Sequence, residues 1–270
     1  MKHGTSGGGR GTGDGKRSLL YSLPTMWRRI VCLLGLASAV VLAQQVPQTF
    51  KVQPLRPVVE LRAEALKAQP PVEHGDFLKP DLVELIKLDP SIKLDIHYAS
   101  ANNFLGVPVY GEARAFLERP AAEAVVRINR RLHAQGYGLL IFDGYRPWYI
   151  TRIFWDATRP QEHPYLADPA EGSRHNRGCA VDLTIYDLKT GQPVSMPSTY
   201  DDFSERAQPG YPGGTADERA HREFLRKTME GEGFTVYPTE WWHFDYREWR
   251  KYPILNVPFS EIRAQSGASQ

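Results

Sequence analysis

The sequence predicts a single α+β domain with a central antiparallel sheet and flanking helices. Segments with alternating or continuous apolar residues, which indicate strands, are mixed with segments of helical periodicity. The two kinds do not alternate regularly, as they would in a parallel βαβ fold. The 227 residues that follow residue 43 are enough for one well-buried domain, and they contain no internal repeat.

The first 43 residues differ in composition from the rest of the chain. Residues 1–18 are Gly-rich and basic without apolar periodicity, which indicates a disordered leader or a misassigned start. After Met26, a basic pair, a short apolar run and the small residue Ala43 are typical of a secretory signal peptide. We therefore expect residues 1–43 to be a leader plus signal peptide. The protein is then exported to the periplasm or cell envelope, without a stable membrane span after cleavage. An uncleaved membrane anchor is the alternative.

The charge of the chain is concentrated in this leader. The whole chain has a net charge of +2, but residues 1–43 hold six Lys or Arg and one acidic residue. The remainder has 27 basic and 30 acidic residues, a net charge of −3, so no nucleic-acid partner is expected. Cys179 is the only cysteine after residue 43, which excludes an intramolecular disulfide there. The sequence carries no signal for an oligomeric state.

The expected elements follow in chain order. Residues 44–75 are Pro-rich and weakly apolar, which predicts a linker or a strap over the surface ahead of a folded domain at 76–270. The expected helices have apolar residues at helical spacing and Pro or Gly near their ends, and they span 82–88, 120–135, 147–158 and 216–230. The expected strands span 92–98, 138–142, 180–187, 234–237 and 242–246.

Two short segments, SRHNRGCAVD and EWWH, carry the candidate chemistry. The first holds His175 and Asp182, and the second holds Glu240 and His243. Catalytic zinc needs three protein ligands, a position open to water and a nearby base that takes the proton of that water. The segments therefore predict a zinc hydrolase with two imidazoles and one carboxylate as ligands. The alternative is a plain sheet in which these histidines only form hydrogen bonds.

Strand parity predicts where these side chains point. Asp182 lies on the face opposite the apolar residues of its strand, whereas Cys179 shares their parity and is expected in the core. Glu240 is three positions from His243, so a regular strand would place the two on opposite sides. Glu240 can approach the metal only if the backbone turns at Pro238-Thr239. A helical segment would also join the pair, but the two tryptophans favour a strand.

The spacing of these motifs resembles a known family. His175-x6-Asp182 followed by Glu240-x-x-His243 resembles the zinc signature of the M15 peptidases, which share a fold with D-Ala-D-Ala carboxypeptidases and hedgehog-type domains. The segments YASANNF, DGYRP, AVDLT and EWWH further resemble the D-alanyl-D-alanine dipeptidases of the VanX type. The resemblance runs from about residue 94 to residue 246, with the motifs in the order of the family.

The resemblance implies a role for each matching residue of the reaction centre. His175, Asp182 and His243 would bind zinc. Glu240 would take the proton of the water and pass it to the leaving amine. Arg146 matches the arginine that stabilises the tetrahedral oxyanion, where a fixed positive charge meets developing negative charge. A surface ion pair is the alternative for Arg146.

The resemblance also implies contacts to the substrate. Tyr98 and Asp201 match positions that hold the free ammonium of the dipeptide, although Asp202 could take the place of Asp201. Ser173 matches a serine that forms a hydrogen bond with the substrate, and a turn-forming serine is the alternative.

The chain departs from the family pattern beside the first histidine. Arg174 and Asn176 replace smaller hydroxyl residues, and Cys179 stands where a residue without a thiol is common. We expect these changes to reshape the rim of the pocket without altering the chemistry.

Together, these residues predict a zinc-dependent dipeptidase that hydrolyses D-alanyl-D-alanine or related dipeptides, with a small dipeptide as its partner. One alternative is a D,D-carboxypeptidase that acts on longer cell-wall peptides, in which no carboxylate would bind a free ammonium. Another is a zinc-containing binding module without catalysis. The presence of both Glu240 and Arg146 argues against that module.

Overall fold

The computed structural model describes residues 50–262 of the chain. The expected leader and signal peptide, residues 1–43, therefore lie outside the described residues. Within the described range, no helix has both the length and the apolar character needed to span a bilayer.

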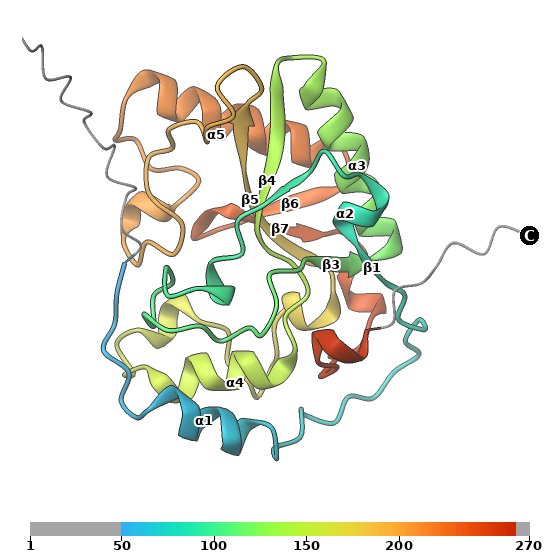
Figure 1. The fold of residues 1–270 in the computed structure, drawn as a ribbon, viewed down its shortest axis with the longest axis vertical. Helices are drawn as coiled ribbons and strands as arrows, with labels where there is room; N and C mark the ends of the chain where they lie inside the picture. Colours follow the sequence, from blue (N-terminus) through green and yellow to red (C-terminus); the bar gives the residue numbers. More distant parts are fainter. Residues whose placement is uncertain (1–49, 263–270) are drawn as a thin grey trace, which may run out of the picture. The chain divides into compact units, whose positions relative to one another are not determined.

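A five-stranded sheet forms the centre of the fold (Figure 1). Its strands lie in the order β2 (Lys93–Leu94), β4 (Tyr137–Asp143), β5 (Ala180–Asp187), β7 (Glu240–Tyr246) and β6 (Phe234–Tyr237). All neighbouring strands are antiparallel except the edge pair of β2 and β4, which is parallel. A small second sheet pairs β1 (Leu82–Glu84) with β3 (Phe116–Glu118). The expected α+β class with an antiparallel central sheet is confirmed.

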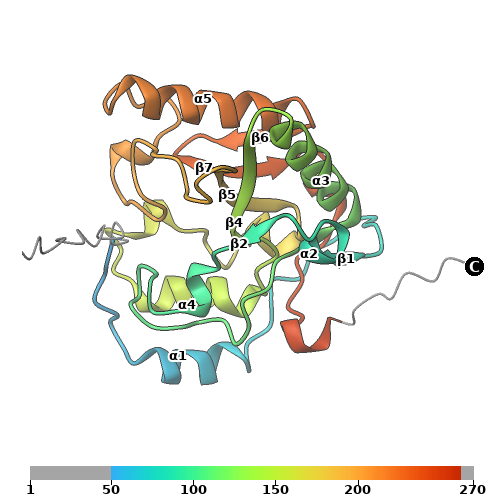
Figure 2. The same cartoon turned by 45° about the horizontal axis from the view of Figure 1, so that its top comes forward.

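Helices pack around this sheet. Helix α3 (Arg119–His133) packs on β4, and α5 (Ala216–Glu230) packs on β6 and β7. Helix α4 (Trp148–Ala157) lies beside α1 (Val58–Ala65) on another side of the sheet (Figure 2). The apolar stripe of α3 is fully buried, as its periodicity predicts: Ala121, Ala124, Val125, Ile128 and Leu132. The shorter helical segments are α2 (Leu85–Leu88) and the 3₁₀ turns η1 (His97–Ala99), η2 (His163–Tyr165), η3 (His175–Arg177), η4 (Glu205–Ala207), η5 (Trp249–Lys251) and η6 (Phe259–Glu261).

Two expected elements of the first half of the chain were wrong, and a third segment contains a helix that was not expected. The helix expected at 82–88 is divided into β1 and α2, because residues 82–84 pair with β3. The strand expected at 92–98 ends after Leu94, and η1 follows it. The segment 44–75 is more than a linker or a strap, because its described part contains α1. This helix buries Leu61 and Ala65 and packs on α4, so α1 contributes to the core.

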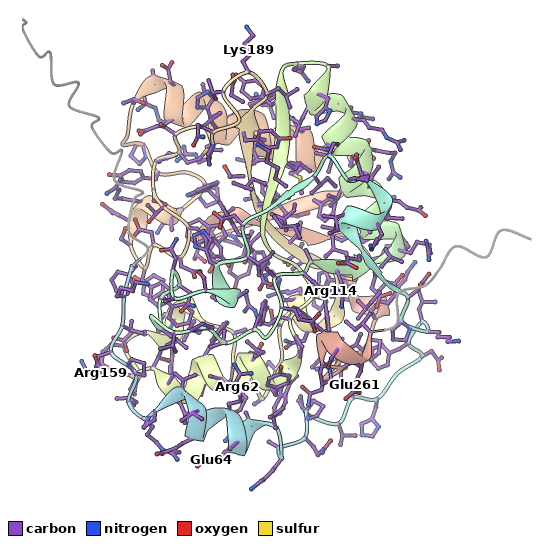
Figure 3. All side chains as sticks on the ribbon, viewed as in Figure 1. Arg62, Glu64, Arg114, Arg159, Lys189 and Glu261 are labelled. Carbon is purple, nitrogen blue, oxygen red and sulfur yellow. The ribbon has the colours of Figure 1, made fainter. Side chains whose placement is uncertain are left out.

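Ionisable side chains are distributed unevenly between the surface and the interior. Glu64, Arg159 and Lys189 lie on surface elements and point away from the core (Figure 3). In contrast, a group of charged or titratable side chains is buried near the ends of β4, β5 and β7: Asp143, Arg146, His175, Asp182 and His243. Because burying a charge is costly unless it is compensated, this group marks a candidate functional site.

Candidate metal centre

The pairing of β5 with β7 brings Asp182 and His243 together, although they lie far apart in the sequence. These two residues are direct partners in the antiparallel register. His175 lies in η3, immediately before β5, and Gly178 provides the left-handed turn between them with a φ of +63°. A Cβ atom at Gly178 would also lie 2.5 Å from Leu82 Cδ2 and 3.2 Å from the Glu118 amide nitrogen, so the turn favours glycine. The fold thus brings together the three predicted ligands.

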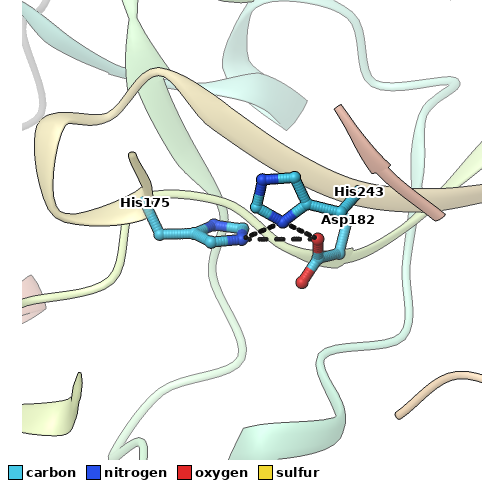
Figure 4. A group of neighbouring side chains, drawn as sticks. All are labelled: His175, Asp182 and His243. Atoms are coloured by element: carbon cyan, nitrogen blue, oxygen red, sulfur yellow. Dashed lines mark hydrogen bonds and ion pairs between the residues drawn. The ribbon is translucent and has the colours of Figure 1, made fainter. Parts of the chain in front are cut away.

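The three side chains point toward a common position (Figure 4). His175 Nε2 lies 3.1 Å from His243 Nδ1 and 3.3 Å from Asp182 Oδ1, and His243 Nδ1 lies 3.1 Å from the same oxygen. All three residues are buried. A shared metal ion needs the two imidazoles close enough to contact one atom, and the distance of 3.1 Å between their inner nitrogens meets this condition.

The outer nitrogen of each imidazole has its own acceptor. His175 Nδ1 is 2.7 Å from the Gly144 carbonyl oxygen, and His243 Nε2 is 2.9 Å from Asp245 Oδ1. Because these oxygens accept hydrogen bonds, the neutral tautomers carry their protons on the outer nitrogens. The inner nitrogens then direct lone pairs at the common position, as they do in metal-ligating histidines.

The carboxylate of Asp182 makes a positive charge favourable at this position. Its Oδ2 accepts a hydrogen bond of 2.9 Å from the Tyr200 hydroxyl, whereas Oδ1 is buried without a hydrogen-bond donor among the described residues. Burial lowers the pKa of His243, but the carboxylates of Asp182 and Asp245 outweigh this and raise it well above its usual value. Metal ions compete with protons for such ligands. Two nitrogens and one carboxylate oxygen fit a divalent cation such as zinc.

A shift in the register between β6 and β7 places Glu240 beside the ligands. Val236 of β6 is opposite Phe244 of β7, but the next residue, Tyr237, is opposite Glu240. This shift supplies the backbone turn that the sequence required, and Glu240 Oε2 lies 3.5 Å from His243 Nδ1. Burial raises the pKa of the Glu240 carboxyl to about 7, although its side chain is 22 % exposed. A carboxyl with this pKa can accept and return a proton near neutral pH.

Arg146 lies beside the same centre and is buried, so it is no surface ion pair. Its Nε and Nη2 lie 3.0 and 2.8 Å from Asp143 Oδ2, and Nη2 is 3.9 Å from Asp182 Oδ2. The guanidinium also lies over the rings of Tyr98 and Phe154, at 5.3 and 5.0 Å from their centroids. These contacts hold a permanent positive charge beside the predicted metal position.

Asp201 and Tyr98 lie together in the same cavity. The Tyr98 hydroxyl donates a hydrogen bond of 3.1 Å to Asp201 Oδ1. The other carboxyl oxygen of Asp201 is buried without a hydrogen-bond partner among the described residues. Burial, together with the nearby charge of Asp182, raises the pKa of Asp201 well above its usual value. Asp201 also has a φ of +56°, the one positive value at a non-glycine residue in the described range, so its backbone is strained.

These groups line one cavity of about 340 Å³. Its wall includes all three predicted ligands, Glu240, Arg146, Tyr98 and Asp201. Ser173 also lines it, but its hydroxyl accepts a hydrogen bond of 3.2 Å from the His175 amide, as expected of a turn-forming serine. Cys179 is buried outside this wall, as its strand parity predicted.

Sequence reasoning did not identify three of the supporting residues. Asp143 forms an ion pair with Arg146, and the Tyr200 hydroxyl donates a hydrogen bond to Asp182. Asp245 accepts a hydrogen bond from the His243 ring. Asp245 carried a signal, because it lies two positions after His243 on the same face of the strand. Asp143 stands in the same DGYRP segment as Arg146. Tyr200 comes from a loop and had no comparable signal.

The comparisons with known proteins agree with this geometry. The sequence model of peptidase family M15, described as D-ala-D-ala dipeptidase, matches residues 79–263. The D-alanyl-D-alanine dipeptidase of Escherichia coli K12 is 32 % identical over 180 residues, which cover 67 % of this chain and 92 % of that protein. The dipeptidase of Enterococcus faecium is 36 % identical over 180 residues, covering 60 % and 89 %. That of Enterococcus faecalis is 37 % identical over 189 residues, covering 63 % and 89 %. This chain therefore belongs to the D-Ala-D-Ala dipeptidase family of M15 peptidases.

Proposed function

We propose that this protein is a zinc-dependent dipeptidase that hydrolyses D-alanyl-D-alanine or a close relative. The observation that carries the proposal is the convergence of His175, Asp182 and His243 on one position, with Glu240 beside it. The relatives named D-alanyl-D-alanine dipeptidase support the substrate class.

His175, Asp182 and His243 would hold the zinc ion. When bound, zinc would lower the pKa of a water molecule and polarise the scissile carbonyl. Glu240 takes a proton from the attacking water at its carboxylate and returns it to the nitrogen of the leaving amine. A pKa of about 7 suits both transfers near neutral pH.

Arg146 stabilises the negative charge that develops on the carbonyl oxygen during attack. Asp143 fixes the guanidinium through contacts of 2.8 and 3.0 Å, so the positive charge needs no rearrangement during the reaction. Loss of such a donor typically lowers the rate by on the order of 100-fold or more.

Asp201 and Tyr98 bind the free ammonium of the substrate. An unpaired carboxyl in this buried place favours its neutral form, and a substrate ammonium would supply the missing positive charge. A longer peptide would place an uncharged amide there and leave the carboxyl unpaired. The site therefore favours a dipeptidase over a carboxypeptidase that trims longer chains.

The proposal extends to the leader. Residues 1–43 act as a leader plus signal peptide, and the enzyme acts in the periplasm or cell envelope on residues 44–270. The basic pair, the apolar run and the small residue Ala43 support it. Sequencing the amino terminus of the mature protein tests it, since cleavage after Ala43 leaves a chain that begins at Gln44.

Glu240→Ala separates metal binding from catalysis. The variant keeps all three ligands, so we expect an unchanged zinc content and a rate on D-Ala-D-Ala that is lower by roughly 10²- to 10⁴-fold. Zinc is measured by elemental analysis and hydrolysis by the release of free alanine. Full activity in this variant would refute the role of Glu240 as the base.

Product analysis with matched substrates tests the substrate class. D-Ala-D-Ala, L-Ala-L-Ala and N-acetyl-D-Ala-D-Ala are compared with the zinc-loaded wild-type enzyme. The proposal expects rapid hydrolysis of the first and little of the others. Rapid hydrolysis of the acetylated peptide favours a carboxypeptidase, and bound zinc without turnover of any peptide favours a binding module.

A further inference from the structure

Arg174 is a charged side chain of the cavity wall that the proposed mechanism does not use. It immediately precedes His175, and its carbonyl oxygen accepts hydrogen bonds from the amides of Arg177 and Cys179, at 3.1 Å each. These bonds fix its backbone in the turn that carries the first ligand. The side chain is 36 % exposed, so its charged end can meet a solute in the cavity.

The guanidinium of Arg174 is held in place but has unused hydrogen-bond donors. Its Cζ lies 4.9 Å from the ring centroid of Trp249 and 5.5 Å from that of Tyr237. Its Nε is 3.5 Å from Asp245 Oδ2, which is too long for a good hydrogen bond, and this buried atom has no hydrogen-bond partner among residues 50–262. A planar group with free donors is suited to binding a carboxylate in a bidentate manner.

The cavity wall carries more carboxyl groups than cationic side chains, so a cationic side chain in the wall favours the entry of a substrate carboxylate. The wall carries six carboxyl groups: Asp168, Glu171, Asp182, Asp201, Asp202 and Glu240. Among the described residues of the wall, the side chains of Lys or Arg are Arg146 and Arg174. Arg146 has contacts of 2.8 and 3.0 Å with Asp143 and is assigned to the oxyanion, whereas the ion pair of Arg174 with Asp245 is longer, at 3.5 Å. Arg174 is therefore the cation of the wall that is better placed to meet the substrate carboxylate.

The contacts of Arg174 also place it at the end of the site away from the ammonium pocket. Arg174 meets Asp245 and Tyr237, which both contact His243. Asp201 instead meets Tyr98, which lies under Arg146 near Asp182. A dipeptide spans about 7 Å and carries an ammonium at one end and a carboxylate at the other, with the scissile bond between them.

We propose that Arg174 binds the terminal carboxylate of the dipeptide and so selects substrates with a free carboxyl terminus. This inference rests on the proposed dipeptidase function, and it assigns the recognition of the second substrate charge. The competing explanation is that Arg174 only positions Asp245, and through it His243.

Paired substrates distinguish the two explanations. D-Ala-D-Ala is compared with its carboxyl-terminal amide in the wild type and in Arg174→Met, which keeps an aliphatic stem against Trp249. We expect the preference of the wild type in kcat/KM for the free acid to fall by about 10- to 100-fold in the variant, mostly through KM for the acid. Arg174→Lys keeps the charge without the planar fork and should retain part of the preference.

Arg177→Met is a matched control from the same turn. Arg177 also lies near Trp249, at 5.6 Å from its ring centroid, but it bonds the Tyr252 carbonyl and Glu73 and is not part of the cavity wall. The ratio of kcat/KM for the free acid to kcat/KM for the amide should be the same in Arg177→Met as in the wild type. An equal loss of kcat/KM on both substrates in Arg174→Met would overturn the proposal in favour of the positioning role.

Equilibrium binding tests the inference independently of turnover. The two peptides are titrated into zinc-loaded Glu240→Ala, with and without Arg174→Met. The proposal is supported if Glu240→Ala binds the acid more tightly than the amide and the double variant with Arg174→Met does not. Equal binding of both peptides to both proteins overturns it. Failure of the wild type to hydrolyse any dipeptide would instead refute the proposed function, while this binding result would still decide the role of Arg174.

Discussion

The two ends of the cavity are constructed differently. Two of the three predicted metal ligands, Asp182 and His243, are register partners on paired strands, and His175 lies in η3 directly before β5. The outer nitrogen of each histidine has an acceptor. Asp201 instead lies in a loop, with a strained backbone and one hydrogen bond to its side chain. The difference indicates that the reaction centre depends on strand geometry, whereas recognition depends on loop residues whose carboxyl is incompletely paired.

The largest expected effect comes from removing a ligand at the rigid end. His175→Ala leaves two ligands, so we expect loss of bound zinc and a fall in hydrolysis of roughly 10³-fold or more. Since the strands are held by their own pairing, the folded structure should persist, with an unchanged far-ultraviolet circular dichroism spectrum. Zinc content and alanine release are measured on the same samples.

His221→Ala is the matched control for this change. His221 is half-buried, and its Nδ1 lies 3.1 Å from the Ser195 carbonyl oxygen, outside the cavity wall. It should keep the zinc content and activity of the wild type. A His175→Ala enzyme with full zinc and full activity would show that the three side chains are not the metal site.

A smaller and more selective effect is expected at the loop end. Asp201→Asn removes the charge but keeps a residue that tolerates a positive φ. We expect KM for D-Ala-D-Ala to rise by roughly 10- to 100-fold with a smaller change in kcat, because the substrate ammonium loses its buried partner. The residual rate on N-acetyl-D-Ala-D-Ala should change little. Steady-state kinetics on both peptides measure the difference.

Asp202→Asn tests the same assignment from the neighbouring position. Asp202 also lines the cavity, and the sequence alone could not separate it from Asp201. Only Asp201 bonds the Tyr98 hydroxyl in the described structure, so Asp202→Asn should have the weaker effect on KM. The opposite order would move the ammonium site to Asp202.

The two ends also differ in how far the sequence could predict them. The bounds of β5 and α5 were predicted, because long periodic segments with clear end signals specify their own structure. The ligands were predicted because their spacing matches a family motif. The secondary structure of the short segments 82–88 and 92–98 was predicted wrongly. Pairing with residues that are distant in the sequence decides whether such short segments become strands.

The supporting contacts of the site could be predicted only in part. The register shift that brings Glu240 to His243 depends on the pairing of β6 with β7, which no local pattern defines, so only the need for a backbone turn could be predicted. Tyr200 and Asp201 are adjacent in a loop, yet one supports Asp182 and the other faces the ammonium pocket. Such roles arise from tertiary placement.

The last expected effect is on stability instead of activity, and it concerns a buried carboxyl outside the cavity, where burial can be separated from function as the cause of a raised pKa. Glu118 lies at the end of β3 and is fully buried. Its Oε2 accepts a hydrogen bond of 2.7 Å from the Asp81 amide, and its Oε1 has no hydrogen-bond partner among the described residues. Burial raises the pKa of Glu118 to about 7, as it does for Glu240, although Glu118 does not line the cavity.

The effect of Glu118 on stability should therefore depend on pH. In the folded state the carboxyl stays protonated up to about pH 7, whereas in the unfolded state it ionises above about pH 4.5, so folding loses stability as the pH rises between these values. Glu118→Gln cannot ionise. Relative to the wild type, it should gain free energy of unfolding between about pH 5 and pH 8, by up to about 3 kcal/mol. Urea unfolding at the two pH values measures the gain.

Glu84→Gln provides a control of opposite sign. Hydrogen bonds from Arg114 lower the pKa of Glu84, so its ionised form stabilises the fold above the pKa of the unfolded state. As the pH rises through the pKa of this carboxyl in the unfolded state, the free energy of unfolding of Glu84→Gln should fall relative to that of the wild type. If the difference between Glu118→Gln and the wild type does not change with pH, burial alone does not raise the pKa of Glu118, and the comparable shift at Glu240 would need a cause specific to the cavity.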